Sequence, residues 1–407
     1  VSEITYFAYY KKYVIMWCMQ RFDIICPCHF GLEAVLKREI VDLGYEGILV
    51  EDGKVTFKGD EDAICRANMF LRTAERILLK VGSFKALDFD TLYNETYKLD
   101  WENYIPEDGR VWVTKANSIR SKLFATVNIQ SVMKKAIASK LCKVYGLNTL
   151  PETGADYPLR VVLNKDEVTI GIDTSGESLH KRGYRQLTTK APIEETLASA
   201  LLMLTPWHHD RILADPFCGS GTFAIEAALM GLNIAPGINR EFTAENWKNL
   251  LTRKNWYDAV TEANDLEIRD RKLKIYASDI DPNVLKLARK NASLAGVEEY
   301  INFRCAPAEK FSPKGDYGFI VTNPPYGQRL EDIETAKKIW AGFCEQFKLL
   351  PTWSCYVISP IADTEQIMGR KADRKRKIYN GMMKTDFYQF LGRKPRKDNE
   401  NNSIRNN

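Results

Sequence analysis

The sequence of 407 residues lacks the features of a membrane protein and of a disulfide-bonded secreted protein. No apolar run approaches the roughly 20 residues that a membrane-spanning helix needs. The nine cysteines are an odd number, are scattered along the chain and lie mostly in apolar segments, which favours buried thiols in a reducing cytoplasm. Cys26, Cys28 and His29 stand close together, but no second ligand pair follows at the spacing of a zinc site. No metal is therefore predicted.

Acidic residues are missing from one long stretch. Between Gly109 and Pro151 there is no Asp or Glu. A solvated surface normally mixes both signs, so a stretch of one sign creates a positive field that suits a phosphate backbone. The alternative is an ordinary lysine-rich surface. The candidate nucleic-acid contacts in this stretch are Lys115, Arg120, Lys122, Lys134 and Lys135.

The length of the chain suggests two or three domains, and its content of 45% hydrophobic and 27% charged residues is typical of a globular protein. From Phe22 onward, apolar patterns predict the order β-α-β-β-α-β, which is that of a ferredoxin-like module. Asp52-Gly53 is the hairpin signal between its second and third strands. The segments with these patterns are 22–26, 31–44, 48–51, 54–58, 60–73 and 75–82.

The acid-free stretch also carries a recognisable pattern. "SIRSKLFATVNIQSVMKKAIASKL", followed by "LRVVLNKDEVTIGIDTSGESLHKRGYR", resembles a THUMP domain. THUMP domains are RNA-binding modules of enzymes that modify tRNA and rRNA. The resemblance implies that the partner is RNA rather than DNA.

Past "HKRGYRQ" the pattern changes, and from "RILADPFCG" onward strands alternate with helices, which predicts a doubly wound parallel sheet. "RKIYN" and "DFYQF" flank Asn380-Gly381, so the sheet is expected to end in an antiparallel hairpin. In such sheets, ligands bind beyond the carboxyl ends of the strands. Three motifs stand at those ends.

The first motif is "DPFCGSGT", which begins at Asp215. Gly219, Gly221 and Ala224 fit the G-x-G-x-x-A dinucleotide fingerprint, so a nicotinamide enzyme is the alternative. Two features argue against it. Asp215 would place a carboxylate where a pyrophosphate should lie, although a carboxylate would attract the ammonium of S-adenosylmethionine (SAM). The acid expected about 20 residues further on is also missing, because the next strand ends only at Asp279.

The second motif is "ASDIDP". Asp279, at a strand end, can accept hydrogen bonds from both ribose hydroxyls of an adenosine. Asp281 is predicted to cap the helix that begins at Pro282. The alternative is that both aspartates are caps.

The third motif is "NPPYG". If the Asn323 side-chain oxygen and the Pro324 carbonyl accept the two hydrogens of a base's exocyclic amine, the amine lone pair is free to attack a methyl sulfonium. Tyr326 would stack on the base, which must first swing out of any helix. No strong general base is needed, so positioning and electrostatics would dominate catalysis. The alternative is a proline-rich turn without function.

Together the three motifs resemble those of class I SAM-dependent amino-methyltransferases. "APIEETLASALL", "APGINREFTAENW" and "GFIVTNPPYGQRL" are closer still to the bacterial 23S rRNA guanine-N2 methyltransferase family. One departure is Pro307, which stands where many relatives carry an Asp that accepts from adenine, so adenine recognition is expected from the backbone near Ala308. The resemblance places Asp215, Phe217, Gly219, Gly221 and Asp279 at the cofactor and Asn323, Pro324, Pro325 and Tyr326 at the base.

The resemblance implies a cytoplasmic enzyme that transfers a methyl group to the N2 amine of a guanine in 23S rRNA. The alternatives are a tRNA guanine-N2 methyltransferase and a non-catalytic RNA-binding assembly factor. The Asn-Pro-Pro-Tyr turn also occurs in enzymes that methylate adenine, cytosine or protein glutamine. The expected organisation is an N-terminal extension (1–20), a ferredoxin-like domain (21–82), a THUMP region (83–175), a class I methyltransferase domain (176–392) and a disordered tail (393–407).

Two further segments allow two interpretations each. Trp247 and Trp256, in an unusually long connection, could wall a base pocket or form the core of that segment. The basic run at residues 370–377 could touch RNA or form a solvated face.

Overall fold

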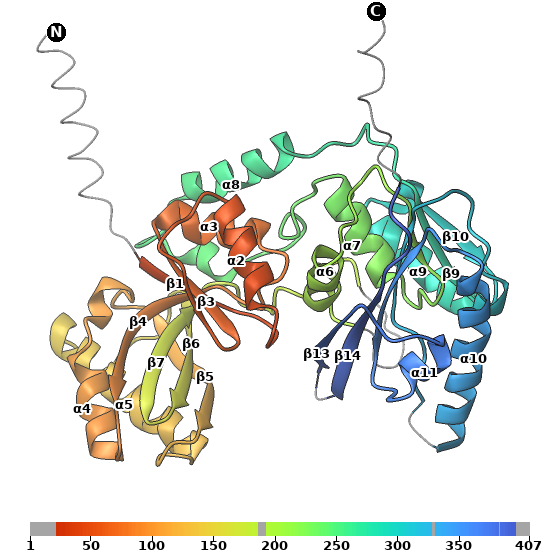
Figure 1. The fold of residues 1–407 in the computed structure, drawn as a ribbon. Coiled ribbons are helices and arrows are strands. Elements are labelled where there is room, and N and C mark those ends of the chain that lie inside the picture. The colour runs from red at the N-terminus through yellow and green to blue at the C-terminus, as the bar shows by residue number, and fades with distance from the viewer. Residues whose placement is uncertain (1–21, 186–192, 328–329, 382, 396–407) are drawn as a thin grey trace, which may run out of the picture. The chain divides into compact units, whose positions relative to one another are not determined.

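The computed structural model describes residues 22–185, 193–327, 330–381 and 383–395 (Figure 1). These residues form two compact units. Unit 1 contains the described residues of 22–28, 32–179 and 236–265, and unit 2 those of 29–31, 180–235 and 266–395. The expected N-terminal extension and most of the expected tail lie outside the described residues.

The first half of unit 1 confirms the ferredoxin-like order. Its strands are arranged β2-β3-β1-β4, and the Asp60 side chain caps α3 by accepting a hydrogen bond from the Ala63 N–H at 3.0 Å. The elements are β1 (Phe22–Pro27), α2 (Glu33–Asp42), β2 (Leu49–Glu51), β3 (Lys54–Gly59), α3 (Glu61–Phe70) and β4 (Leu78–Lys85).

The second half of unit 1 continues the same sheet. The outer edge of β4 pairs with β7, which gives one seven-stranded sheet in the order β2-β3-β1-β4-β7-β6-β5. A boundary between residues 82 and 83 therefore falls within β4, a strand that pairs with both halves. The further elements are α4 (Phe89–Lys98), η1 (Trp101–Asn103), β5 (Arg110–Ile119), α5 (Thr126–Tyr145), β6 (Asp156–Asn164) and β7 (Glu167–Asp173).

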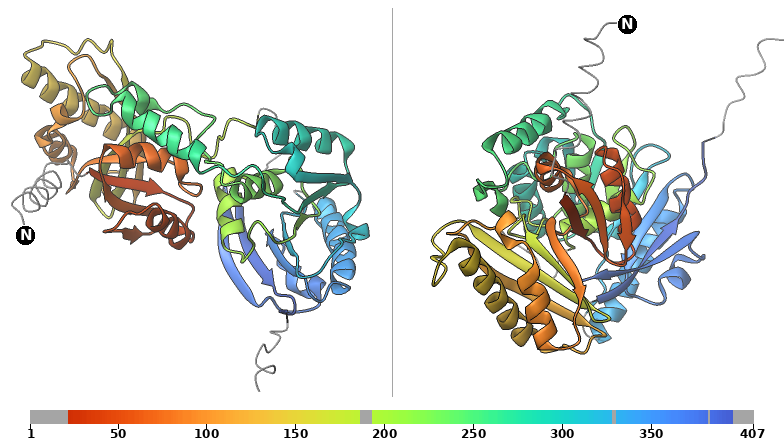
Figure 2. Two further views of the ribbon diagram at one scale, coloured as in Figure 1. Left: turned by 90° about the horizontal axis from the view of Figure 1, so that it is seen from above. Right: turned by 90° about the vertical axis from the view of Figure 1, so that its left-hand side faces the viewer.

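Residues 236–265 belong to unit 1, whereas the methyltransferase domain expected from sequence, residues 176–392, includes them. This segment contains η2 (Thr243–Asn246) and α8 (Arg253–Asp265), and α8 packs on α3 (Figure 2). Trp247 is fully buried, stacks on Tyr157 with ring centroids 4.9 Å apart, and donates from Nε1 to the Asp156 carbonyl. Trp256 stacks on Phe242 at 5.2 Å. Both tryptophans are therefore core residues of unit 1.

Unit 2 confirms the doubly wound sheet. Its strand order is β10-β9-β8-β11-β12-β14-β13. The first five strands of this order, from β10 to β12, are parallel to their neighbours. Strand β14 runs antiparallel to β12 and pairs with β13 as the expected hairpin. The strands are β8 (Leu213–Asp215), β9 (Ile275–Asp279), β10 (Ile301–Cys305), β11 (Phe319–Thr322), β12 (Ser354–Ser359), β13 (Arg374–Asn380) and β14 (Met383–Phe390).

Helices cover both faces of this sheet (Figure 1). On one face α6 packs on α7 and α7 on α9. On the other, Trp340 and Phe343 of α10 join a buried cluster with Ile320, Val357 and Tyr388 of the sheet. None of the helices within the described residues is both long and apolar enough to cross a membrane. The helical elements are α6 (Glu195–Met203), α7 (Thr222–Gly231), α9 (Pro282–Leu294), η3 (Glu298–Tyr300), η4 (Ala308–Lys310), α10 (Leu330–Lys348) and α11 (Thr364–Met368).

Strand β8 lies between β9 and β11, so the chain order reverses there. In an open α/β sheet this reversal opens a crevice beyond the carboxyl ends of the strands. All three motifs follow strands that surround this point.

Candidate active site

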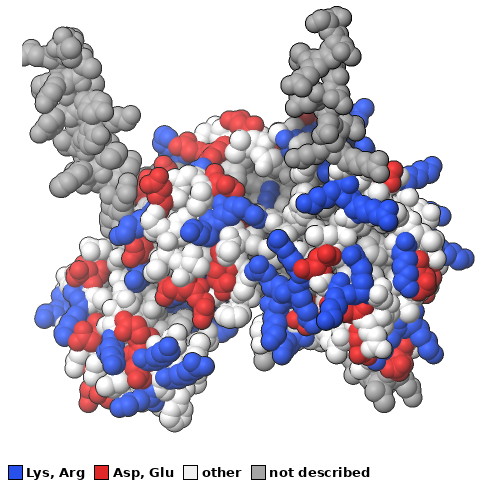
Figure 3. All heavy atoms as spheres, viewed as in Figure 1, with Lys and Arg blue, Asp and Glu red and all other residues white. Residues whose placement is uncertain are grey.

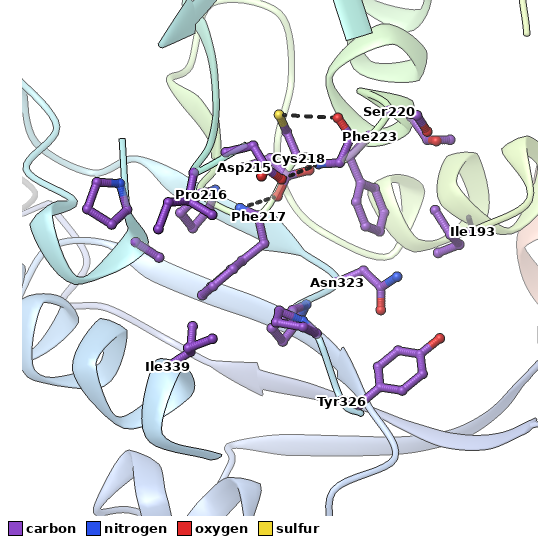
Figure 4. Close-up of a pocket in the computed structure, with 18 of the residues that line it drawn as sticks. Ile193, Asp215, Pro216, Phe217, Cys218, Ser220, Phe223, Asn323, Tyr326 and Ile339 are labelled. Atoms are coloured by element: carbon purple, nitrogen blue, oxygen red, sulfur yellow. Dashed lines mark hydrogen bonds between the residues drawn. The ribbon is translucent and has the colours of Figure 1, made fainter. Parts of the chain in front are cut away.

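A pocket of about 590 Å³ lies at the carboxyl ends of β8, β9, β10 and β11 (Figure 4). Its size falls in the range of small-molecule and cofactor sites. All three motifs contribute to its lining: residues 215–220 after β8, Asp279 and Ile280 at the end of β9, and residues 323–327 after β11. Residues 307–309, after β10, complete this side.

Asp215 is a buried acidic residue of the pocket, with only 2% of its surface exposed. Its Oδ1 accepts hydrogen bonds from the Thr322 hydroxyl at 2.6 Å and from the Phe217 N–H at 3.2 Å. Burial and, to a smaller extent, the charge of Asp279 raise the pKa of the Asp215 carboxyl to about 7, against the lowering effect of these two hydrogen bonds. Because Asp215 ends β8 and Thr322 ends β11, this hydrogen bond links the first motif to the strand that precedes the third motif.

Asp279 is held by two backbone hydrogen bonds. Its Oδ2 accepts from the Gly219 N–H and its Oδ1 from the Asp281 N–H, both at 3.0 Å. Each carboxylate oxygen has a second lone pair, so both can still accept from a ligand. Asp281, in turn, caps α9 by accepting from the Asn283 N–H at 2.8 Å, as predicted.

The two glycines of the first motif have different roles. Both have a positive φ, +52° at Gly219 and +88° at Gly221, a region that favours glycine. Gly219 lines the pocket, and a Cβ there would meet nothing within 4 Å. Gly221 is not among the lining residues; it precedes α7, and a Cβ there would lie 3.2 Å from the Ala288 Cβ of α9. Gly221 thus lets α7 and α9 approach closely and supports the loop of the first motif from behind.

Phe217 and Ala308 also line the pocket. The Phe217 ring packs edge-on against Phe343 at 5.6 Å and is held against the α10 side of the core. Ala308 is 5% exposed and begins η4, directly after Pro307. These contacts hold two walls of the pocket in place.

Asn323 has an unsatisfied buried acceptor. Within the described part of the chain its Oδ1 is buried and has no hydrogen-bond partner. Figure 4 shows the Asn323 amide and the Tyr326 ring on the same side of the pocket. An unpaired buried acceptor costs about 1–3 kcal/mol, so this atom favours a ligand that donates an N–H or O–H.

The rest of the third motif forms the adjoining wall. Pro324 is buried, Pro325 is exposed and Tyr326 is half-buried. Burial raises the pKa of the Tyr326 hydroxyl, and a hydrogen bond with the Asn380 side chain at the end of β13 partly offsets this rise. The third motif is thus tied to the terminal hairpin of the sheet.

Sequence reasoning missed Arg185, which supports the pocket from the α6 side. Its Nη2 donates to the Thr222 hydroxyl at 2.7 Å and to the Ile193 carbonyl at 3.0 Å, and its Nε lies 3.0 Å from a Glu195 carboxylate oxygen. Ile193 and Thr222 both line the pocket. The only sequence signal was the run "HKRGYR" before an acidic helix start.

The five candidate RNA contacts are all exposed on unit 1, but the positive field of their stretch is partly neutralised. Lys134 pairs with Glu152 at 3.1 Å, and Lys140, also in the acid-free stretch, with Glu102 at 3.4 Å. Both acids lie outside that stretch. Lys115 lies on β5, Arg120 and Lys122 follow it, and Lys135 lies on α5. The Lys122 backbone N–H donates to an Asp166 carboxylate oxygen at 2.7 Å, and the Lys122 charge acts on the Asp88 carboxylate. Within the described residues, Lys115, Arg120 and Lys135 form no ion pair.

Three family models match the chain. The model described as "RMKL-like, methyltransferase domain" matches residues 182–389, and the "RlmL ferredoxin-like domain" matches residues 23–78. The "THUMP domain" matches residues 86–173. The three matches follow the order expected from the sequence.

Individual relatives agree with these matches. "Putative RNA methyltransferase YpsC" of Bacillus subtilis is 44% identical over 387 residues, which cover 94% of this chain and 100% of that protein. "Ribosomal RNA large subunit methyltransferase K/L" of Shewanella woodyi is 31% identical over 366 residues, or 88% of this chain, and the chain spans 51% of its length. The solved structure of "SMU.472, a putative methyltransferase complexed with SAH", is 40% identical, has a TM-score of 0.88, and covers 93% of this chain and 100% of its own.

Proposed function

Because this chain belongs to the RMKL-like methyltransferase family, we propose that it transfers the methyl group of SAM to the exocyclic N2 amine of a guanine in 23S rRNA. We choose an amine as the methyl acceptor because the Asn323 side-chain oxygen is buried and unpaired in a pocket that also holds Asp215 and Asp279. SAM supplies an electrophilic methyl group on a sulfonium, and SAH, seen in a relative, is what remains after transfer.

The acidic residues of the pocket fit the polar groups of SAM. Asp215 offers a buried carboxylate for the ammonium group, which compensates for the cost of burying that charge. Asp279 is oriented by two backbone N–H groups and keeps two lone pairs for the ribose hydroxyls. Gly219, which leaves open space at its Cβ position, allows the cofactor to approach the backbone.

Asn323 and Pro324 fit a planar amine with two N–H donors. The Asn323 oxygen accepts one hydrogen and the Pro324 carbonyl accepts the other, which holds the nitrogen in place and draws it toward a tetrahedral geometry. The half-buried ring of Tyr326 provides a face for the base. The proton leaves after attack, so rate enhancement comes from orientation and from fixed hydrogen-bond acceptors.

Ribosomal RNA as substrate is supported by the THUMP match and by the name of the K/L relative. A tRNA guanine is the second candidate, because THUMP domains occur in enzymes for both RNAs. The choice of guanine rests on the resemblance of the motifs to guanine-N2 enzymes.

The test is product analysis. The purified protein is incubated with SAM and unmodified 23S rRNA or tRNA, and the digested nucleosides are identified by mass spectrometry. N2-methylguanosine from 23S rRNA is expected. A methylated adenine, cytosine or guanine N7 would overturn the guanine-amine assignment, and N2-methylguanosine from tRNA alone would overturn the choice of RNA.

Two variants test the role of the third motif. Asn323→Ala should fold, bind SAM and lose roughly 10²–10³ in turnover, as when one preorganised polar group is removed. Asn323→Asp should lose less, because a carboxylate still accepts hydrogen bonds. Tyr326→Phe is the control that keeps the ring face and should retain most activity. Full activity in Asn323→Ala would show that the motif is only a turn.

A further inference from the structure

Strand β13 forms the outer edge of the unit 2 sheet and carries four consecutive exposed cations, residues 374–377. Lys384, the second residue of β14, is also exposed. The face of unit 2 seen in Figure 3 shows Lys and Arg side chains gathered where Figure 1 places β13 and β14.

Part of this charge is already engaged within unit 2. Lys375 lies 3.2 Å from an Asp386 carboxylate oxygen and 4.6 Å from the centre of the Tyr388 ring. Arg376 donates to a main-chain carbonyl oxygen at 2.6 Å. By contrast, Arg374, Lys377 and Lys384 form no ion pair with any acid in the described part of the chain. These three cations are called the hairpin cations below.

The hairpin ends beside the pocket. Because β14 is antiparallel to β12, the turn between β13 and β14 lies at the carboxyl edge of the parallel strands, where the pocket opens. Asn380, the last residue of β13, makes a hydrogen bond with the Tyr326 hydroxyl. At about 3.4 Å per residue, Lys377 stands about 10 Å along the strand from Asn380. Lys384 follows Met383, the register partner of Asn380.

We propose that the hairpin cations bind phosphates of the RNA strand that flanks the methylated base. The proposal rests on the proposed function: a base that swings into the pocket leaves its neighbouring phosphates at the pocket mouth. Exposed cations without acidic partners gain the most from such an interaction, because they release condensed counterions and break no ion pair. The hydrogen bond from Asn380 couples this surface to the ring that receives the base.

The test compares two triple variants that remove the same charge. The first is Arg374→Gln with Lys377→Gln and Lys384→Gln. The control is Lys272→Gln with Lys274→Gln and Lys290→Gln, which are exposed residues of the same unit. Lys272 and Lys274 precede β9 and therefore lie at the opposite edge of the sheet. Binding of transcribed 23S rRNA is measured at several salt concentrations, and SAM affinity by calorimetry.

For the hairpin variant, the slope of log K against log salt should fall by about 0.7 for each phosphate that is no longer neutralised, or about 2 in all. SAM affinity should stay unchanged in both variants, and the control should keep the wild-type slope. Equal slopes for the two variants would overturn the proposal and leave the cations as charges that keep an edge strand from pairing. That result, with N2-methylguanosine still formed by the wild type, would leave the proposed function standing. A reduced slope in the hairpin variant, with a product other than N2-methylguanosine, would support the surface and refute the guanine assignment.

Discussion

Asp215 should make SAM binding depend on pH in a predictable direction. The carboxyl is 2% exposed, and burial raises its pKa to about 7. The proposed ion pair with the SAM ammonium needs the ionised carboxylate. With a pKa of about 7, about 3% of Asp215 is ionised at pH 5.5 and about half at pH 7. If SAM binds only the ionised form, its association constant should rise about 16-fold over this range.

The assay is isothermal titration calorimetry with SAM at pH 5.5, 6.0, 6.5 and 7.0. The range stops at 7 because an α-amino group loses its own proton near pH 7.7–8.0. Asp215→Asn, which keeps the size and the hydrogen-bond acceptor, should bind more weakly and with a flat profile. Asp279→Asn is the matched control, since it removes a second acid from the same pocket. SAM affinity should still rise with pH in this variant, over a range shifted to lower pH, because the Asp279 charge adds to the rise that burial causes in the pKa of Asp215.

The same carboxyl should affect the stability of the free protein with the opposite slope. A carboxyl whose folded pKa is raised binds its proton more tightly in the native state, so its contribution is full below about pH 4 and is lost as pH rises through 7. The difference between the ordinary pKa of an Asp, 3.8, and the folded value of about 7 corresponds to roughly 4 kcal/mol of stability. Without SAM, the wild type should lose stability relative to Asp215→Asn between pH 4 and 7.

For the binding experiment, a wild-type SAM affinity that stays constant from pH 5.5 to 7 would refute an ion pair between the Asp215 carboxylate and the SAM ammonium.

Three further predictions concern other parts of the molecule. Asp279→Ala should weaken SAM binding by about 1.5–3 kcal/mol, roughly 10- to 150-fold in Kd, because charged hydrogen bonds to the ribose are removed; calorimetry with unchanged affinity would contradict this. Lys122→Glu with Lys135→Glu leaves the Lys134–Glu152 pair intact and should lower RNA affinity and flatten its salt dependence without changing SAM binding. Filter binding that matches the wild type at every salt concentration would make the acid-free stretch a solvated surface. Trp247→Ala should destabilise unit 1 by about 3–5 kcal/mol, measured as faster hydrogen exchange there, because a fully buried ring is removed; unchanged protection would contradict its place in the core.

The part of the site that follows from strand ends could be predicted from sequence. "DPFCGSGT", "ASDIDP" and "NPPYG" are far apart in the chain, yet the alternation of strands and helices already places them at one edge of a sheet. The cap at Asp281 was predictable for a similar reason, since Pro282 and the apolar pattern mark where the helix begins.

The remaining features depend on spatial neighbours that a linear pattern does not contain. From sequence, Trp247 could wall a base pocket or form a core, and nothing local shows that its partner is Tyr157, which lies on β6 in the first half of the chain. A stretch free of acids in sequence is not free of them in space, as the pairing of Lys134 with Glu152 shows. The same holds for Gly221, whose role depends on the approach of another helix.

The assignment of residues 236–265 to unit 1 has a consequence for how the protein is made. Besides the short segment 29–31, which belongs to unit 2, the chain passes between the units at residues 179–180, 235–236 and 265–266. During synthesis, the sheet of unit 1 is complete by Asp173, but its covering segment with Trp247 and α8 emerges only after β8 and α7 have been translated. Unit 1 therefore cannot finish folding before the ribosome has begun unit 2, and the THUMP-containing unit cannot be produced intact by ending translation at residue 179.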